Sequence, residues 1–499
     1  MKVVKDLEED NQQSNQKHDQ PPSGFIKMKK FQFVMLIFVL VFATAGITTF
    51  ALAFGDEKAV NVGVTERSEF DKLYEAYDSL NKEYYKELDK EKLVNGAING
   101  MLDSLEDPYS DYMNKEEAKK FNQSISSSFE GIGAEIQERD GTIVVVSPIK
   151  GSPAEAAGLK PNDKIIEVDG KNIQGMSVTD AVLLIRGEKG TEVTLTIQRP
   201  GSEDTTQVKI TRDEIPLETV YPEMQENGIA KIQITSFSDD TYDELVKAIE
   251  QMKKEGMKGL VLDLRQNPGG LLDQAIKISN LFVPAGEPIL QIDDNKGSVE
   301  KVMAEEGKKV EVPVAVLIDN GSASASEILA AAVSETTEIP LVGTKSFGKG
   351  TVQTAENFSD GSNMKLTSAK WLTPNGNWIH EKGIKPDVKV ELPAYAKLPF
   401  LNPEKDLKKS AVSEQVKAAE EMLKALGFNP GDVDGFYDEN TVKAVKEFQD
   451  KEKLEVTGVL KGESTLKLMD LLRKKMVEDD PQVKKAVERL QEKIKGKKE

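Results

Sequence analysis

The sequence contains no cysteine and only two histidines among its 499 residues. The absence of cysteine excludes thiol nucleophiles, disulfide bonds and thiolate-bound zinc. Two histidines are too few to form a cluster of metal ligands, so we expect chemistry that uses no metal and no other cofactor. The formal net charge of −19 also argues against general nucleic-acid binding, because the phosphate backbone attracts basic surfaces.

The scarcity of histidine limits how a serine could act as a nucleophile. A serine hydroxyl needs a base to accept its proton, and that base is usually histidine. His18 lies in a polar N-terminal tail and His380 in a predicted loop. Lysine is the remaining candidate, provided that burial and neighbouring groups lower its pKa from about 10.4 to roughly 7 to 8.

Ser324 lies at a predicted strand-to-helix turn. The apolar run 312–319 (VPVAVLID) is typical of a buried strand, and the alanine-rich stretch 325–334 (ASEILAAAVS) favours a helix. The unpaired N–H groups in the first turn of such a helix point at an oxyanion that forms beside the serine. On this pattern alone, Ser322 and Ser326 compete with Ser324 as the nucleophile.

A second turn of this kind follows the apolar run 259–263 (GLVLD). It continues through residues 264–270 (LRQNPGG) into a helical stretch, and its glycines let backbone donors approach a substrate. Lys349 lies between two glycines after a later predicted strand, and small neighbours of this kind allow a lysine to be buried. Together these segments predict an α/β core.

The motifs LDLRQNPGG, GSASASEI and FGKGTVQ together resemble the carboxyl-terminal processing, or tail-specific, peptidases. The interval between Ser324 and Lys349 is similar to the spacing in that family. The resemblance implies that Ser324 is the nucleophile, that Lys349 is the general base and that Gln353 orients the lysine. It also implies a ClpP/crotonase-like α/β peptidase core, which we place at residues 213–395.

The same resemblance implies an oxyanion hole made by the N–H groups of Ala325 and Gly270. The sequence leaves Gly269 open as the alternative to Gly270. Losing one such donor typically lowers the rate by about 10² to 10³.

Two other motifs overlap the lysine. Residues 343–350 (GTKSFGKG) nearly spell a phosphate-binding loop, but Gly350 stands where a Ser or Thr would bind magnesium. Residues 346–349 match the Ser-x-x-Lys of penicillin-binding enzymes, yet the glycines oppose the helix that this motif requires, and no Lys-Thr-Gly is present. We therefore interpret both matches as coincidental.

Residues 124–212 resemble a PDZ domain, inserted before the core, on the motifs FEGIG (129–133) and GSPAEAAGL (151–159). A PDZ groove binds the C-terminal segment of its ligand as an added strand, and loop N–H groups hold the terminal carboxylate. The resemblance implies that Gly131, Ile132 and Gly133 supply these groups, and that the partners are protein substrates with apolar C-terminal tails. The domain either delivers the tail to the core or blocks the core until a ligand moves it.

Residues 31–54 carry no charge and as a helix would span about 36 Å, more than the bilayer core of about 30 Å. Lysines precede this segment and acidic residues follow it, so the positive-inside rule places residues 1–30 in the cytoplasm. We expect a single-pass anchor in the cell membrane, with the catalytic region outside the cytoplasm on the cell-wall side. A cleaved signal peptide ending at residues 51–53 (ALA) is the alternative.

The regions around these domains have helical periodicity. Residues 62–120 predict helices for packing or for a homodimer. After a polar linker at 396–411, residues 412–472 resemble a three-helix peptidoglycan-binding domain, on the motif DGFY and a later FQ. Residues 473–499 predict a charged amphipathic helical tail that is solvated or dimer-associated.

The sequence thus predicts a membrane-anchored serine endopeptidase that recognises substrate C-termini through a PDZ domain and binds peptidoglycan. The alternative from another class is a non-catalytic scaffold that localises partners through its PDZ and wall-binding domains. A cell-wall amidase or transpeptidase is a third option, and the missing Lys-Thr-Gly and zinc ligands argue against it.

Overall fold

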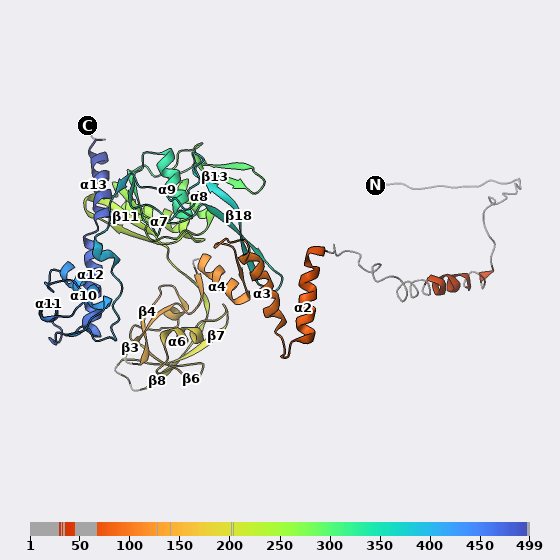
Figure 1. Ribbon diagram of the computed structural model, residues 1–499, viewed down its shortest axis with the longest axis horizontal. Helices are drawn as coiled ribbons and strands as arrows, with labels where there is room; N and C mark the ends of the chain where they lie inside the picture. Colours follow the sequence, from red (N-terminus) through yellow and green to blue (C-terminus); the bar gives the residue numbers. More distant parts are fainter. Residues whose placement is uncertain are drawn as a thin grey trace, which may run out of the picture. The chain divides into compact units, whose positions relative to one another are not determined.

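The computed structural model in Figure 1 describes residues 29–30, 32, 35–44, 67–126, 128–139, 141–200, 202 and 204–496. The chain divides into two compact units, residues 1–93 and residues 94–499.

Part of the predicted membrane segment lies within the described residues. Residues 35–44 form a helix with exposed side chains. Residues 31, 33–34 and 45–54, and the tail up to residue 28 with His18, lie outside the described residues. Within the described part of the chain, no helix is both long and apolar enough to cross a membrane.

The first unit contains the 3-10 helix η2 (Ser68–Phe70), the helix α2 (Asp71–Glu83) and the start of α3 (Lys90–Asp103). Helix α2 buries none of its residues. Leu73 and Leu80, two helical turns apart, are both exposed. The role of these helices in packing or in a homodimer stays a prediction.

A six-stranded sheet in the order β10-β11-β12-β15-β16-β19 lies at the centre of the second unit. β10 is antiparallel to β11, and the 3-10 helix η3 (Glu226–Gly228) connects these two strands. The other neighbouring pairs in the sheet are parallel. β12 and β15 are buried along their whole lengths, as parallel strands are when both faces of the sheet are covered. The strands are β10 (Val220–Met224), β11 (Ile229–Ile234), β12 (Gly259–Asp263), β15 (Val314–Ile318), β16 (Leu341–Gly343) and β19 (Val388–Lys389).

Three helices cover one face of this sheet: α7 (Thr241–Lys254), α8 (Leu272–Ser279) and α9 (Ala325–Thr336). Successive residues of a strand point to opposite faces, and Leu260 and Leu262 of β12 belong to the core that these helices complete. Helix α8 follows β12 and α9 follows β15, so the two intervening turns lie at the same edge of the sheet.

The last helix, α13 (Pro481–Gly496), covers the other face. Its apolar residues Val483, Ala486 and Leu490 are buried against the strand residues that alternate with the first set, such as Val261 and Leu317. The prediction that the C-terminal tail is solvated or dimer-associated is therefore wrong for this helix. A parallel sheet needs cover on both faces, and α13 supplies the second cover.

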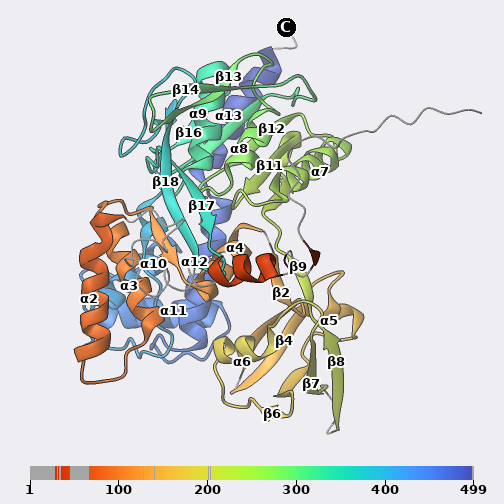
Figure 2. The ribbon, with the colours of Figure 1, turned by 90° about the vertical axis from the view of Figure 1, so that its right-hand side faces the viewer.

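A second sheet of five strands has the order β1-β18-β13-β14, with β17 also pairing with β18. Figure 2 shows β17 and β18 as two long neighbouring strands. β1 precedes the PDZ segment in sequence but pairs with β18 of the core, so the PDZ domain is an insertion within the core fold. The strands are β1 (Asp111–Met113), β13 (Pro288–Asp294), β14 (Val299–Met303), β17 (Thr351–Asn357) and β18 (Asn363–Leu372).

The PDZ segment forms an antiparallel sheet in the order β3-β4-β5-β7-β8, with β6 paired to β5. β3 is at the edge of this sheet. Helix α4 and a two-stranded ribbon of β2 and β9 connect the domain to the core. The elements are α4 (Lys115–Ile125), β2 (Ser128–Gly131), β3 (Ala134–Arg139), β4 (Thr142–Pro148), α5 (Pro153–Ala156), β5 (Lys164–Val168), β6 (Lys171–Asn172), α6 (Val178–Ile185), β7 (Glu192–Gln198), β8 (Thr205–Thr211) and β9 (Asp213–Pro216).

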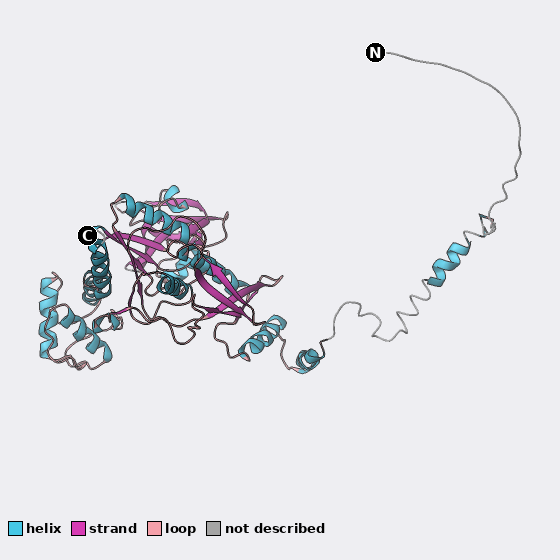
Figure 3. Ribbon diagram, turned by 90° about the horizontal axis from the view of Figure 1, so that it is seen from above, coloured by secondary structure: helices cyan, strands magenta, loops and turns pink. Residues whose placement is uncertain are grey.

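The C-terminal domain contains three helices, which Figure 3 shows in cyan: α10 (Glu414–Ala425), α11 (Glu439–Lys451) and α12 (Glu463–Glu478). Burial raises the pKa of Glu420 in this domain, and its carboxylate accepts hydrogen bonds from Gly435 N (3.0 Å) and Thr441 Oγ1 (3.0 Å). The predicted linker is more ordered than expected, because Leu401 and Leu407 are buried in the domain's own core after the 3-10 helix η4 (Ala394–Lys397).

Candidate active site

Ser324 is the N-cap residue directly before helix α9, and it has an unusual backbone conformation, φ 53° and ψ −113°. A positive φ is uncommon for a residue with a Cβ atom, and such strain occurs mostly at functional sites. The Ser324 N–H donates to Glu327 Oε2 (2.9 Å), so the next turn of the helix holds this conformation in place.

A cavity of about 400 Å³ opens beside Ser324. The structure brings all five core residues predicted from the sequence to its wall: Ser324, Ala325, Gly270, Lys349 and Gln353. Much of the remaining wall is apolar, with side chains from α4, α8, α9, β17 and β18: Phe121, Ile125, Leu272, Ile328, Val352 and Trp371. The cavity therefore joins a serine and a lysine in surroundings from which water is partly excluded.

The competing serines face other groups. Ser322 Oγ donates to Leu264 O (2.8 Å), and Ser326 Oγ donates to Asn267 O (3.0 Å). Both side chains are fully buried, and neither residue lines the cavity. Of the three serines that the sequence left open, the structure places only Ser324 at the cavity.

Lys349 is partly buried just before β17. Burial lowers the pKa of its amine, and the positive charge of Lys365 lowers it further, whereas Asp107 and Glu327 act in the opposite direction. The Lys349 Nζ lies 4.8 Å from the centroid of the Tyr109 ring. The ring face attracts the ammonium form, but burial and Lys365 lower the pKa overall and so favour the neutral amine, which is the form that can accept a proton.

Tyr109 is a residue of this site that sequence reasoning missed. It lies in the loop before β1, in a region where only packing helices are expected from the periodicity. Its ring also meets that of His380 edge-on, with centroids 6.0 Å apart. His380 Nδ1 accepts the N–H of Gly350 (3.3 Å), and His380 does not line the cavity.

Glu327 is the second residue that sequence reasoning missed. Its fully buried carboxylate accepts the backbone N–H groups of both Ser324 (2.9 Å) and Lys349 (2.8 Å). It also accepts Gly348 N (2.7 Å) and Ser346 Oγ (2.5 Å), so four donors compensate its burial. The available signal was the Ser-x-x-Glu spacing at the start of an alanine-rich helix, which is the pattern of a capping box.

Backbone hydrogen bonds distinguish the two glycines considered for the oxyanion hole. The Gly269 N–H donates to Asn267 Oδ1 (2.8 Å), whereas Gly270 lines the cavity. At Gly270, where φ is +146°, an added Cβ would lie 2.1 Å from Phe237 O, so only glycine fits. This geometry favours Gly270 over Gly269 as a backbone donor. Ala325 occupies the first position of α9, where N–H groups have no partner within the helix.

Gln353 lies in β17 and lines the same cavity, but its side chain makes its hydrogen bonds with two threonines. Gln353 Nε2 donates to Thr351 Oγ1 (2.9 Å) and Thr367 Oγ1 (3.3 Å). No hydrogen bond joins Gln353 to Lys349 in the described structure. Any orienting effect on the lysine therefore passes through the start of β17.

The phosphate-loop match does not have the geometry of a phosphate site. Residues 344–350 form a loop that leads into the strand β17, whereas a phosphate-binding loop opens a helix.

The three predicted PDZ loop residues follow one another at the end of β2. Ile132 O accepts Ala154 N (2.8 Å), and Gly133 O accepts Ile149 N (2.9 Å), so both carbonyl groups are engaged by the domain itself. Gly133 has a φ of +73°, and an added Cβ would lie 2.4 Å from Ser152 Cβ.

Four family models match the chain. "Peptidase family S41" matches residues 228–390, and "PDZ domain" matches residues 122–198. "Activating protease CtpB N-terminal domain" matches residues 51–117, and "Putative peptidoglycan binding domain" matches residues 412–469.

Two curated proteins of Bacillus subtilis (strain 168) are similar over most of the chain. The carboxy-terminal processing protease CtpA is 51% identical over 465 residues, which are 93% of this chain and 99% of that protein. The carboxy-terminal processing protease CtpB is 46% identical over 408 residues, 81% of this chain and 85% of that protein. Among solved structures, the photosystem II D1 C-terminal processing protease is 28% identical, with a TM-score of 0.40, over 66% of this chain and 94% of that one. The chain therefore belongs to peptidase family S41 and is a serine peptidase of the carboxy-terminal processing type.

Proposed function

We propose that this chain is a membrane-anchored, extracytoplasmic endopeptidase that uses a Ser324/Lys349 dyad. The observation that carries the proposal is the shared cavity, in which Ser324 has a strained backbone and the pKa of Lys349 is lowered by burial. His380, the histidine that the sequence offers as another base, does not line the cavity.

The chemistry proceeds through an acyl-enzyme. Ser324 Oγ attacks the carbonyl carbon of a peptide bond while the neutral Lys349 amine accepts the hydroxyl proton. The tetrahedral intermediate then collapses, and the proton passes from Lys349 to the leaving amine. Water attacks the resulting ester, with Lys349 again accepting a proton, and Ser324 is restored.

The N–H groups of Ala325 and Gly270 stabilise the oxyanion of each tetrahedral intermediate. Support comes from the N–H of Ala325, which has no partner within the helix at the first position of α9, and from the place of Gly270 in the cavity wall. Gln353 fixes the start of β17 through Thr351 and so orients the preceding Lys349.

The PDZ domain recognises the substrate's C-terminal tail. β3 is an edge strand, and such an edge can accept an added strand from a ligand. The loop of Gly131, Ile132 and Gly133 directly before β3 then binds the terminal carboxylate. Apolar tails fit this mode, because Leu183 of the neighbouring helix α6 is exposed.

The two ends of the chain localise the enzyme. The uncharged segment 31–54, preceded by lysines, anchors it in the cell membrane with the peptidase outside the cytoplasm. The C-terminal domain binds peptidoglycan and holds the peptidase in the cell wall.

The test is cleavage of an unstructured protein by the purified chain, with the substrate's C-terminal tail varied. We expect Ser324→Ala and Lys349→Ala each to lower turnover by roughly 10³-fold or more. Lys345→Ala is the matched control, because Lys345 is an exposed lysine in the same loop. Apolar tails should be cleaved faster than charged ones.

Wild-type protein that cleaves no substrate, with any tail, would support the scaffold alternative. Cleavage that survives Ser324→Ala would exclude this dyad.

A further inference from the structure

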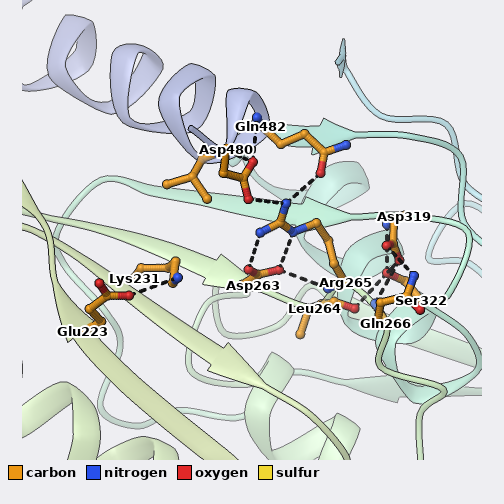
Figure 4. Close-up of polar contacts among 11 residues, drawn as sticks. Glu223, Lys231, Asp263, Leu264, Arg265, Gln266, Asp319, Ser322, Asp480 and Gln482 are labelled. Carbon is orange, nitrogen blue, oxygen red and sulfur yellow. Dashed lines mark hydrogen bonds and ion pairs between the residues drawn. The ribbon is translucent and has the colours of Figure 1, made fainter. Parts of the chain in front are cut away.

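Arg265 lies in the loop that carries the oxyanion glycine, yet it points away from the cavity towards the C-terminal helix. Figure 4 shows its guanidinium between Asp263 and the start of α13. Nε and Nη2 donate to the two oxygens of Asp263 (2.8 and 2.7 Å). Nη1 contacts Asp480 Oδ2 (2.7 Å) and Gln482 Oε1 (2.8 Å).

This ion pair is largely shielded from water. The side chains of Arg265, Asp263 and Asp480 are 14%, 4% and 12% exposed. Charge pairs at such burial interact more strongly than surface pairs, and removing one partner is costly. The contact therefore fixes the loop firmly to a helix more than 200 residues later in the chain.

On its other side, the same loop forms hydrogen bonds with the turn that carries Ser324. Leu264 O accepts Ser322 Oγ (2.8 Å), and Gln266 donates through N and Nε2 to the carboxylate of Asp319 (2.9 and 2.7 Å). Asn267 O accepts Ala323 N (3.0 Å). Figure 4 shows Asp319 and Ser322 beside this loop.

The start of α13 also binds the chain where it leaves the core. Gln482 Nε2 donates to Val390 O (2.7 Å), directly after β19. The C-terminal domain lies between β19 and α13 in sequence, and only residues 479 and 480 separate α12 from α13. The two chain segments that join the C-terminal domain to the core therefore both lie beside the contact between Arg265 and α13.

We propose that Arg265 is a positioning residue for catalysis, which α13 holds through Asp480 and Gln482 so that Gly270 stays aligned with Ser324. This inference rests on the proposed function and extends it, since it makes the C-terminal helix a support of the oxyanion hole. A small displacement of the loop weakens stabilisation of the transition state more than it weakens substrate binding.

The decisive variant is Asp480→Asn. The Asp480 Oδ1 atom caps α13 by accepting Gln482 N (2.9 Å) and Val483 N (3.1 Å), and asparagine keeps that cap. The substitution replaces only Oδ2, the oxygen that contacts Arg265, with an NH2 group. Asp479→Asn is the matched control: it removes the same charge one residue earlier, where Asp479 is 47% exposed and pairs with Lys475 and Lys484.

With the full chain, we expect Asp480→Asn to lower kcat by about tenfold while KM stays within about twofold. The rates are counted per Ser324 labelled by a fluorophosphonate, so that a smaller folded fraction does not mimic the effect. Gln482→Met, which removes the neighbouring acceptor, should lower kcat in the same direction. Asp479→Asn should match the wild type.

A readout independent of activity separates this inference from the proposed function. Amide hydrogen exchange at residues 264–270 should be faster in Asp480→Asn than in Asp479→Asn. Equal exchange in the two variants, or equal kcat per labelled serine, overturns the positioning role. Activity that does not depend on Ser324 would instead overturn the proposed dyad and leave the exchange result to decide the role of Arg265.

Discussion

Burial and a neighbouring positive charge oppose protonation of the Lys349 amine, and they outweigh the nearby carboxylates. Burial lowers its pKa most, and the positive charge of Lys365, across the β17–β18 pair, lowers it further. A base must be unprotonated, so kcat/KM should rise with pH through the lowered pKa of Lys349. The acid limb of the pH profile therefore reports on this one side chain.

Lys365→Met should move that acid limb to higher pH. Removing a neighbouring positive charge makes the ammonium form of Lys349 less unfavourable, so its pKa rises and less base is present at neutral pH. The measurement is kcat/KM against pH. Lys370→Met is the control on the same strand, because Lys370 lies over the Trp378 ring and outside the cavity. An acid limb that stays in place would show that another group accepts the proton.

Glu327 connects the two proposed catalytic residues through one carboxylate. In Glu327→Gln, an amide NH2 group replaces one of the two carboxylate oxygens, so a hydrogen-bond donor then faces the backbone donors that this oxygen accepted from. We expect a loss of about 1–3 kcal/mol in the free energy of unfolding, because a buried donor is left unsatisfied. We also expect kcat to fall roughly tenfold or more, since Ser324 and Lys349 lose their common support. Urea unfolding and turnover of the variant measure the two effects. A stable variant with normal kcat would contradict this role.

At the scale of elements, α13 is a structural part of the peptidase and not an appendage. Leu490 is fully buried against the strands of the core sheet. Leu490→Ala should lower the free energy of unfolding by about 2–5 kcal/mol, through lost burial and the cavity left behind. Urea unfolding of the core checks this value, and Val477→Ala, at a residue that is 61% exposed in α12, should change little. Equal stabilities would mean that α13 does not hold the sheet.

The sequence predicted the local elements of the site well, because their signals are local. Apolar runs that end in glycine-rich turns indicated β12, β15 and the two turns that carry Gly270 and Ser324. The helix that covers the second face of the sheet was missed. β15 is apolar at every position, and β12 is apolar from Leu260 to Leu262, so both strands require cover on both faces. Helical periodicity in the tail indicated a helix but not its partner.

At the scale of the whole molecule, contacts between distant segments could not be read from the sequence. Tyr109 reaches Lys349 from the far side of the PDZ insertion, and Asp480 reaches Arg265 from beyond the C-terminal domain. Neither residue stands in a motif, and each obtains its place only from the tertiary fold. The strained backbone of Ser324 is likewise a property of the folded turn.

The place of α13 in the chain has a consequence for biosynthesis. The core sheet is complete in sequence at β19, but one of its faces lacks its cover until the last helix has been made. During synthesis, the peptidase therefore cannot reach its finished form before the C-terminal three-helix domain has left the ribosome. A prematurely terminated chain lacks the helix that covers this face, so the order of the domains itself delays completion of the peptidase until the C-terminal domain is present.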